Sequence, residues 1–313
     1  MIKKKILIFG ATGQIGRHLV RKLTKNNYKV TCQTRNSHRA VFLKTSGPLG
    51  YIEVVEANIF DETKIKKLIS ETDICINLIG ILFEKRQNTF KNIHIKFPDL
   101  LSKLCNESNT DLIHLSALGI ENAQDSIYAK SKISGEKIIK SNCKNSVIIK
   151  PSIVYSVNDK FTTKFMSILS LIPLFPLYYK GLTKFTPIHA TDLSDLIYYI
   201  ISKEIKKGSI EALGPEIITF KDIIKKICLS INKKRLLIPM PLSLAKLSAY
   251  FFQKLPTPII TLDQLKLLKY DNVKTNLNKS NFDIGCPSKI KFYDGIKKYS
   301  YNWSEGGQYS LKK

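Results

Sequence analysis

A short apolar run that leads directly into three evenly spaced glycines dominates the amino end of the chain. Ile6-Leu7-Ile8-Phe9 has the unbroken apolar character of a parallel strand buried on both faces. Gly10-Ala11-Thr12-Gly13-Gln14-Ile15-Gly16 follows, and residues 17–23 then change to helical spacing. Strand, glycine turn and helix in this order predict a dinucleotide-binding loop. The alternative is a tight turn whose glycines serve only packing.

Each glycine of this loop has its own predicted task. Gly10 permits the turn, Gly13 lets the backbone approach a pyrophosphate, and Gly16 lets helix and strand pack closely. The amino end of the helix then presents free N–H groups and a partial positive charge to the phosphates. From this loop the predicted cofactor contacts are Gly10, Thr12, Gly13, Gln14, Ile15 and Gly16.

Apolar strands and amphipathic helices alternate from the loop to residue 150. Strands are predicted at 29–34, 51–57, 74–80, 112–116 and 146–150, with helices at 61–68, 90–105 and 128–140. This rhythm predicts an α/β fold with a doubly wound parallel Rossmann sheet. Ligands bind beyond the carboxyl ends of such strands. Here those ends are Gly10, Arg35, Asn58, Gly80, Ser116 and Pro151.

Prolines interrupt shorter segments after residue 151, which predicts a smaller, mostly helical C-terminal lobe. We predict a Rossmann NAD(P)-binding domain over 1–150, to which 185–212 returns. The smaller lobe takes 151–184 and 213–303, and 304–313 is a flexible tail. A helix is predicted at 193–202 within the returning segment, and helices at 220–231 and 242–255 within the smaller lobe.

The helix at 242–255 carries three adjacent aromatic residues, Tyr250, Phe251 and Phe252. We predict that these rings belong to the core of the lobe. The alternative is a helix that lies on a membrane surface, because Lys246 and Lys254 flank its apolar face.

The end of the strand at 29–34 bears on the choice of cofactor. NAD-specific folds usually place Asp or Glu there for the ribose hydroxyls, whereas this chain has Thr34 and Arg35, followed by His38 and Arg39. A guanidinium can pair bidentately with a 2′-phosphate, so we predict NADP(H), with NAD(H) as the alternative. The basic residues could also be a solvated strand end. Further predicted cofactor contacts are Asn58, Ile59, Leu78, Gly80, Tyr128, Lys132 and Pro151.

Three residues form a candidate catalytic group: Ser116, Tyr128 and Lys132. The tyrosine and the lysine are four residues apart on a helix and share one face. The ammonium can lower the tyrosine pKa and hold the nicotinamide ribose. The serine can orient a carbonyl or hydroxyl substrate while the tyrosine passes a proton. The alternative is that tyrosine and lysine only grip the cofactor ribose.

Together these motifs resemble a short-chain dehydrogenase/reductase of the extended or atypical kind, from residue 2 to about Trp303. More narrowly, the chain is similar to the nucleotide-binding accessory subunit of respiratory complex I and its bacterial relatives. The segments that carry this resemblance include 93–94, 114–119, 150–154, 212–216, 255–258 and 263–265.

The resemblance implies a protein that holds NADPH as a structural element, with relatives linked to quinone biosynthesis or to epimerase and reductase chemistry. His94 stands where catalytic members usually have an Asn that positions a water for proton relay, and Asn58 replaces the common Asp near the adenine. We therefore predict a complex I-associated or quinone-linked protein with little or no turnover. The alternative is a soluble NADP-dependent oxidoreductase or epimerase that uses Ser116, Tyr128 and Lys132 on a small substrate, so whether the protein is an enzyme stays open.

The formal net charge of +25 has two explanations, a compositional bias or an acidic partner. No nucleic-acid module is recognisable, so we expect a respiratory membrane complex or an anionic membrane surface rather than nucleic acid. Six widely spaced cysteines without a C-x-x-C pair predict neither a metal site nor a disulfide framework. We expect a cytoplasmic protein, with a peripheral place on the inner face of the membrane as the alternative.

Overall fold

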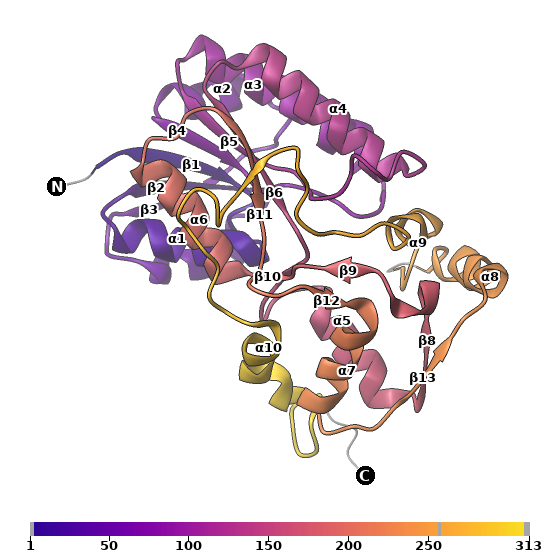
Figure 1. Cartoon of the computed structure of the whole chain (residues 1–313). Helices are drawn as coiled ribbons and strands as arrows, with labels where there is room; N and C mark the ends of the chain where they lie inside the picture. The colour runs from indigo at the N-terminus through magenta and orange to yellow at the C-terminus, as the bar shows by residue number, and fades with distance from the viewer. Residues whose placement is uncertain (1–2, 256–257, 310–313) are drawn as a thin grey trace.

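Eight parallel strands form the central sheet of residues 3–255 and 258–309, which are the residues that the computed structural model describes (Figure 1). Their order across the sheet is β14-β11-β6-β5-β4-β1-β2-β3. The strands are β1 (Lys5–Phe9), β2 (Lys29–Thr34), β3 (Ile52–Glu56), β4 (Ile74–Asn77), β5 (Asp111–Leu115), β6 (Ser146–Pro151), β11 (Gly208–Ala212) and β14 (Lys279–Ser280). The predicted strands between residues 6 and 150 are all present.

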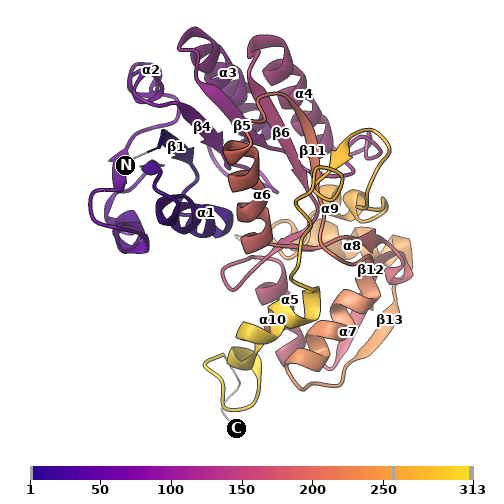
Figure 2. The same ribbon diagram turned by 60° about the vertical axis from the view of Figure 1, so that its left-hand side comes forward.

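Helices cover both faces of this sheet. Figure 2 shows α1 (Gln14–Lys25) and α6 (Ala190–Ser202) on one side, and α2 (Glu62–Ser70), α3 (Phe97–Glu107) and α4 (Ile127–Asn142) on the other. Strand residues alternate between two cores, since Ile6 and Ile8 pack with α1 and α6 while Leu7 and Phe9 pack with α2 and α3. The predicted doubly wound Rossmann sheet is confirmed.

A second, mostly helical lobe lies beyond the carboxyl ends of the strands (Figure 1). Its core joins α5 (Thr162–Leu171), α7 (Phe220–Ser230) and α10 (Phe292–Ser300) around buried aliphatic and aromatic side chains. The lobe also contains three two-stranded sheets. They pair β7 (Val154–Tyr155) with β10 (Ile188–His189), β9 (Lys184–Phe185) with β12 (Ile218–Thr219), and β8 (Leu174–Leu177) with β13 (Leu236–Pro239). Helices α8 (Leu242–Phe252) and α9 (Leu262–Leu267) complete the lobe.

The chain passes between the sheet and the second lobe several times. It leaves the sheet after β6, returns with α6 and β11, leaves again, and returns for β14, which pairs in parallel with β11. The predicted boundaries of the two domains stay a prediction. The edge strand β14 was not predicted, because a pairing of two residues leaves no periodic signal in the sequence.

Two predicted helices differ in detail from the structure. The helix at 193–202 begins earlier, at Ala190, because the ring of His189 accepts a hydrogen bond from the Thr191 N–H and caps it. The predicted helix at 90–105 contains the π-helical segment η2 (Lys91–Lys96) ahead of α3. Smaller 3₁₀ segments are η1 (His38–Ser46), η3 (Tyr178–Gly181) and η4 (Tyr301–Trp303). Beyond η4, Tyr309 packs against the Trp303 ring at a centroid distance of 4.9 Å.

The prediction that the aromatic residues of α8 belong to the core is wrong. Tyr250, Phe251 and Phe252 are 47%, 60% and 37% exposed. Instead, Ala245 and Ala249 are buried and pack in one cluster with Tyr178 of η3 and Leu265 of α9. The helix turns its small residues inward and its large apolar residues outward.

Candidate functional site

The glycine loop joins β1 to α1 with the geometry that its spacing predicts. Gly10 has a φ of +84°, a conformation that glycine adopts without strain. A Cβ on Gly16 would lie 2.5 Å from the carbonyl oxygens of both Gly10 and Ala11, so only glycine fits between helix and loop. Gly13 is exposed, and a Cβ there would approach only the Gly10 carbonyl, at 3.2 Å. The loop is therefore packed beneath α1 and open above Gly13.

The amino end of α1 has no side-chain cap and no acidic residue in its first turn. Its N–H groups and the positive end of its dipole thus face outward beside Gly13. The Gln14 amide donates to the Val154 carbonyl at 2.8 Å, which fixes the loop against β7 of the second lobe. An uncapped helix start next to an open glycine fits a pyrophosphate.

Basic side chains gather where β2 ends. Arg35 and Arg39 are exposed, and neither guanidinium has a hydrogen bond or ion pair within the described residues. Arg17, in the first turn of α1, donates from Nε to the Thr12 carbonyl at 2.9 Å and stacks over the Phe42 ring at 4.3 Å. The nearby carboxylate of Glu56 accepts the Ser37 N–H and hydroxyl, each at 2.8 Å. This end of the sheet therefore offers free guanidinium groups to an anion.

The other predicted nucleotide contacts lie at neighbouring strand ends, as the topology requires. Asn58 is exposed after β3 and its side chain accepts the Phe60 N–H at 3.1 Å, while Ile59 is buried. Leu78 packs against the core under α1. Pro151 is buried at the end of β6, where its carbonyl accepts the Leu118 N–H.

Tyr128, Lys132 and Gly80 come together where α4 crosses the end of β4. A Cβ on Gly80 would lie 3.4 Å from Lys132 Nζ and 3.9 Å from His94 Nε2. The Tyr128 ring meets the His94 ring edge-on at 5.4 Å, and the Phe90 ring at 5.9 Å. The ammonium of Lys132 donates to the Leu115 carbonyl at 3.0 Å. The Lys132 ammonium thus lies beside Gly80, and the Tyr128 ring packs against His94.

Both ring nitrogens of His94 are used by the protein itself. Nε2 accepts the Ile81 N–H at 3.2 Å, so the network places the ring proton on Nδ1, which lies 2.9 Å from Ser131 Oγ. The Ser131 hydroxyl donates onward to the Tyr128 carbonyl. Burial and the positive charge of Lys132 lower the pKa of His94 to about 2. His94 is a neutral structural link between η2 and α4, with no ring nitrogen left for a proton relay.

Ser116 faces a buried group of charged side chains. Its hydroxyl donates to Glu136 Oε1 at 2.5 Å, and Glu136 Oε2 lies 2.9 Å from Lys150 Nζ. Lys150 also contacts Glu121, and the side chains of Lys150 and Glu136 are 5% and 7% exposed. Within the described residues, no hydrogen bond joins Ser116 to Tyr128. The serine proton is therefore committed to Glu136.

The expected lowering of the Tyr128 pKa does not occur. Burial raises the pKa of Tyr128 well above its ordinary value. Burial also lowers the pKa of Lys132 to about 8, while Glu136 acts in the opposite direction. The physical reason is that both groups are enclosed on α4, so each favours its neutral form.

Helix α9 of the second lobe holds the start of α4. The Asp263 carboxylate accepts hydrogen bonds from the Ser126 hydroxyl at 2.8 Å, the Ile127 N–H at 2.8 Å and the Tyr128 N–H at 3.0 Å. Leu267 and Tyr270 pack on the cluster that contains the Tyr128 ring. The second lobe therefore positions Tyr128. Of segment 255–258, which carries part of the resemblance to the complex I accessory subunit, residues 256 and 257 lie outside the described residues.

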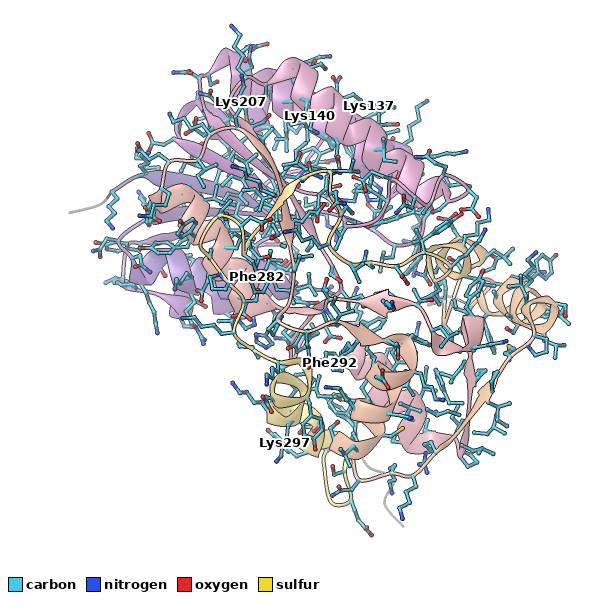
Figure 3. All side chains as sticks on the ribbon, viewed as in Figure 1. Lys137, Lys140, Lys207, Phe282, Phe292 and Lys297 are labelled. Atoms are coloured by element: carbon cyan, nitrogen blue, oxygen red, sulfur yellow. The ribbon has the colours of Figure 1, made fainter. Side chains whose placement is uncertain are left out.

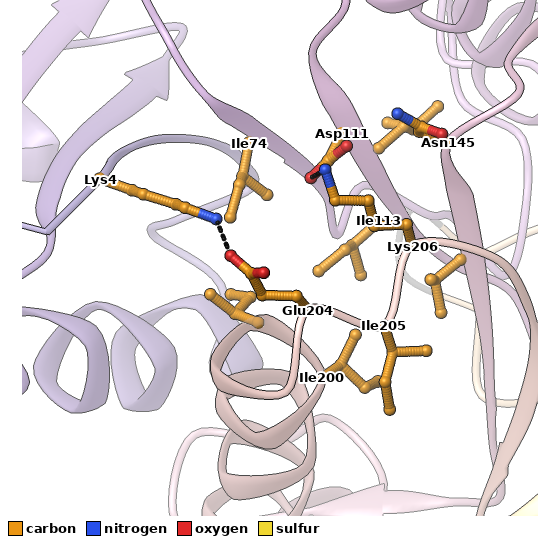
Figure 4. A pocket seen from close by; sticks show the side chains of 12 residues that line it. Lys4, Ile74, Asp111, Ile113, Asn145, Ile200, Glu204, Ile205 and Lys206 are labelled. Carbon is orange, nitrogen blue, oxygen red and sulfur yellow. Dashed lines mark hydrogen bonds and ion pairs between the residues drawn. The ribbon is translucent and has the colours of Figure 1, made fainter.

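The cavity in Figure 4 is separate from this group. It has a volume of about 10 Å³, lies at the amino ends of β4, β5 and β6, and is bordered by the Lys4–Glu204 ion pair. That volume is no larger than one water requires. It also lies at the edge of the sheet opposite the glycine loop.

Sequence reasoning did not identify Arg17, Glu136 or Asp263 as parts of the site. Arg17 directly follows the third glycine, and Glu136 is one helical turn after Lys132, so spacing could have suggested both. Asp263 is far away in the chain, and no local pattern connects it with Tyr128.

Comparison with known proteins defines the class of the fold. Residues 2–94 match the model of the NmrA-like family. The structure superposes with a TM-score of 0.71 on UDP-glucose 4-epimerase from Bifidobacterium longum in complex with NAD+ and UDP, at 13% identity, over 98% of this chain and 100% of that one. The fold is that of the extended short-chain dehydrogenases/reductases, as predicted.

Within this class the chain is similar to subunits of respiratory complex I. It is 24% identical over 282 residues to the mitochondrial NADH-ubiquinone oxidoreductase 40 kDa subunit of Neurospora crassa, covering 89% of this chain and 74% of that protein. It is 30% identical over 222 residues to the mitochondrial NADH dehydrogenase (ubiquinone) 1 alpha subcomplex subunit 9 of Dictyostelium discoideum, covering 70% and 62%. The predicted resemblance to the accessory subunit is confirmed.

Proposed function

We propose that this protein binds NADP(H) in the glycine loop and holds it with little or no turnover, as an accessory protein of a respiratory membrane complex or of its quinone chemistry. The observation that carries the proposal is the state of the predicted catalytic groups. The Ser116 proton goes to Glu136, both nitrogens of His94 are bonded within the protein, and Tyr128 is buried as a phenol. These residues bind and position, and none of them is free to move a proton.

The cofactor part of the proposal is supported by the loop and by the end of β2. The uncapped start of α1 would hold the pyrophosphate, and Arg35 and Arg39 would face a 2′-phosphate. Lys132, beside Gly80, would donate to the ribose hydroxyls near the nicotinamide. When bound, the nicotinamide supplies hydride transfer, while the chain supplies binding and orientation.

The partner part of the proposal is supported by similarity to proteins that are named as subunits of NADH-ubiquinone oxidoreductase. Within the described residues, no helix combines the length and the apolar character needed to cross a bilayer. We propose attachment at the cytoplasmic face of the membrane, through protein or lipid contacts.

Mass spectrometry of the nucleotide released from the purified protein tests the cofactor. We expect NADP+ or NADPH, and release of NAD+ or NADH alone would overturn the assignment.

Oxidation of added NADPH with quinone and carbonyl acceptors tests turnover. Little or no oxidation is expected, whereas turnover that Tyr128→Phe abolishes while nucleotide binding persists would establish the oxidoreductase or epimerase alternative.

Affinity purification of the tagged chain from membranes in mild detergent tests the partner. Subunits of a respiratory NADH dehydrogenase should co-purify. Their absence, from a preparation in which the chain retains its nucleotide, would overturn the accessory role and leave the cofactor assignment standing.

A further inference from the structure

Helix α8 has its apolar side turned away from the protein. Its buried residues are Ala245 and Ala249, which are four positions apart and face η3 and α9. The outward side carries larger apolar residues at spacings of three and four, which form one stripe on a helix. These residues, here called the α8 face, are Leu244, Leu247 and Phe251 of α8 and Leu255 just after its end, with exposures of 54%, 54%, 60% and 44%.

More exposed apolar side chains precede the α8 face in the neighbouring strands. Leu236 and Ile238 of β13 are 62% and 39% exposed, and Leu174 of β8, which pairs with Leu236, is 46% exposed. Figure 1 shows β13 running up to α8 at the right-hand edge of the molecule, away from the central sheet. Single exposed apolar residues are ordinary, but a helix face of this kind marks a contact with something outside the chain.

Two chain segments that supply much of this part of the lobe carry only basic charges, whereas α9, which packs on α8, carries Asp263. Residues 160–191 and 223–262, which supply α5, β8, η3, β13 and α8, contain eleven Lys and Arg and no Asp or Glu. An even spread of the chain's 25 acidic residues would put about six there. The two segments lie between Asp159 and Asp192 and between Asp222 and Asp263, and their own net charge is strongly positive.

One basic residue of α8 and one just after its end lie beside the apolar stripe. Lys246 and Lys254 are exposed, and Lys254 Nζ lies 4.4 Å from the centroid of the Tyr250 ring. An exposed aromatic ring under an ammonium suits the level of lipid headgroups, where an apolar body and a charged tip are both accommodated. A surface that combines apolar insertion with attraction of anions matches an anionic bilayer.

We propose that the α8 face docks on an anionic lipid bilayer, with Leu244, Leu247, Phe251 and Leu255 inserted among the acyl chains and Lys246 and Lys254 at the phosphate level. The docking rests on the proposed attachment at the membrane and names its surface and its lipid chemistry, while it needs neither nucleotide nor partner complex. It orients the second lobe toward the membrane.

Co-sedimentation with protein-free vesicles tests the proposal. The full chain should sediment with vesicles of equal parts phosphatidylglycerol and phosphatidylcholine, bind less to pure phosphatidylcholine vesicles, and dissociate as salt rises. The double change Leu247→Ser with Phe251→Ser should weaken binding by about tenfold or more, because two of the inserted side chains are lost. Leu49→Ser with Leu277→Ser is the matched control. These two leucines are 101% and 68% exposed and do not belong to the α8 face.

A second pair of variants separates the charge at the α8 face from the charge of the whole molecule. Lys246→Gln with Lys254→Gln should weaken binding to the phosphatidylglycerol vesicles severalfold. Lys137→Gln with Lys140→Gln, which removes the same charge from the exposed side of α4 (Figure 3), should have little effect.

Three results would overturn the proposal. The chain could fail to sediment with the phosphatidylglycerol vesicles, or the α8 variants could bind as well as their controls. The third result would be a dimer in sedimentation velocity that becomes a monomer when Leu247→Ser and Phe251→Ser are introduced. That result would assign the α8 face to contact with a second copy of the chain. An unchanged far-ultraviolet circular dichroism spectrum for every variant shows that the variants are folded, and keeps this test independent of the cofactor assignment.

Discussion

Lys132 holds a positive charge where burial disfavours it. Its pKa falls from 10.5 to about 8 because of burial, which Glu136 offsets only in part. Below pH 8 the folded and unfolded chains both carry this proton, so the full cost of burying the ammonium is present. Between pH 8 and 10.5 the unfolded chain binds more protons than the folded chain, and the stability contributed by this group rises with pH.

Lys132→Met should therefore raise the free energy of unfolding at pH 7, by up to about 3 kcal/mol. The gain should disappear above pH 10.5, where both forms are neutral, and nucleotide binding should weaken at every pH. Denaturant unfolding at pH 7, 9 and 11 measures the effect. Lys130→Met, on the exposed side of the same helix, is the control. An equal gain at all three pH values would contradict the role of burial.

Arg35→Ala should separate the two nicotinamide nucleotides. Its free guanidinium is available to a 2′-phosphate, and the loss of a charge-assisted contact costs about 2 kcal/mol, or roughly thirtyfold in affinity for NADPH. NADH has no such phosphate, so its affinity should stay the same. Titration calorimetry measures both nucleotides, with Lys25→Ala at the other end of α1 as control. A parallel loss of affinity for both nucleotides would argue against the NADP(H) assignment.

At the scale of elements, two glycines of the turn between β1 and α1 are predicted to have different roles: Gly16 in stability and Gly13 in nucleotide binding. A Cβ on Gly16 meets two backbone oxygens at 2.5 Å, so Gly16→Ala should displace α1 and cost several kcal/mol of stability, about 2 or more. Gly13→Ala meets only one oxygen at 3.2 Å and should fold nearly normally, yet lose nucleotide affinity because the methyl group covers the phosphate position. Thermal unfolding and nucleotide titration of both variants would show the contrast. Equal stability of the two variants would refute it.

The contact of α9 with α4 predicts a remote effect on the site. Asp263→Asn keeps the side-chain size but removes the charge from the start of α4, and should reduce stability by about 1 kcal/mol. Nucleotide affinity should fall as well, because the same carboxylate fixes the Tyr128 backbone. Asp125→Asn, an exposed acid just before the same helix start, is the control. If the two variants behave alike, α9 does not position Tyr128.

Much of the central sheet was predictable because its strands are apolar on both faces and end in glycine or polar residues. The face that α8 turns inward was not. The helix has large apolar residues on one side and alanines on the other, and burial of the larger side is the usual outcome. Here Ala245 and Ala249 allow close packing on η3 and α9, and only the tertiary arrangement shows this.

The candidate site was predictable in outline but not in its hydrogen bonds. The topology alone brings Gly80, Tyr128 and Lys132 to one edge of the sheet. The partner of Ser116 depends on the register of β6, which places Lys150 and therefore Glu136 within reach. Such pairings between distant segments determine whether a hydroxyl is free for chemistry, and sequence spacing does not encode them.

For the whole molecule, the repeated crossings of the chain predict cooperative unfolding. The C-terminal segment holds the first lobe through Glu211, which accepts the Thr275 N–H at 2.8 Å, and through Asp192, which accepts the Lys289 and Ile290 N–H groups. Fluorescence of Trp303 reports on the second lobe, and far-ultraviolet circular dichroism reports on both lobes. The two signals should change at the same denaturant concentration. Separate midpoints would show that the lobes unfold independently.

The late position of β14 in the chain has a consequence for biosynthesis. Until the ribosome has released Ser280, the strand β11 has no partner on its outer side. Translation at about 5–20 residues per second then leaves this edge open for several seconds. An open strand edge pairs readily with other chains. A message that is truncated after β11 would therefore yield a product prone to aggregation, although it encodes the entire glycine loop.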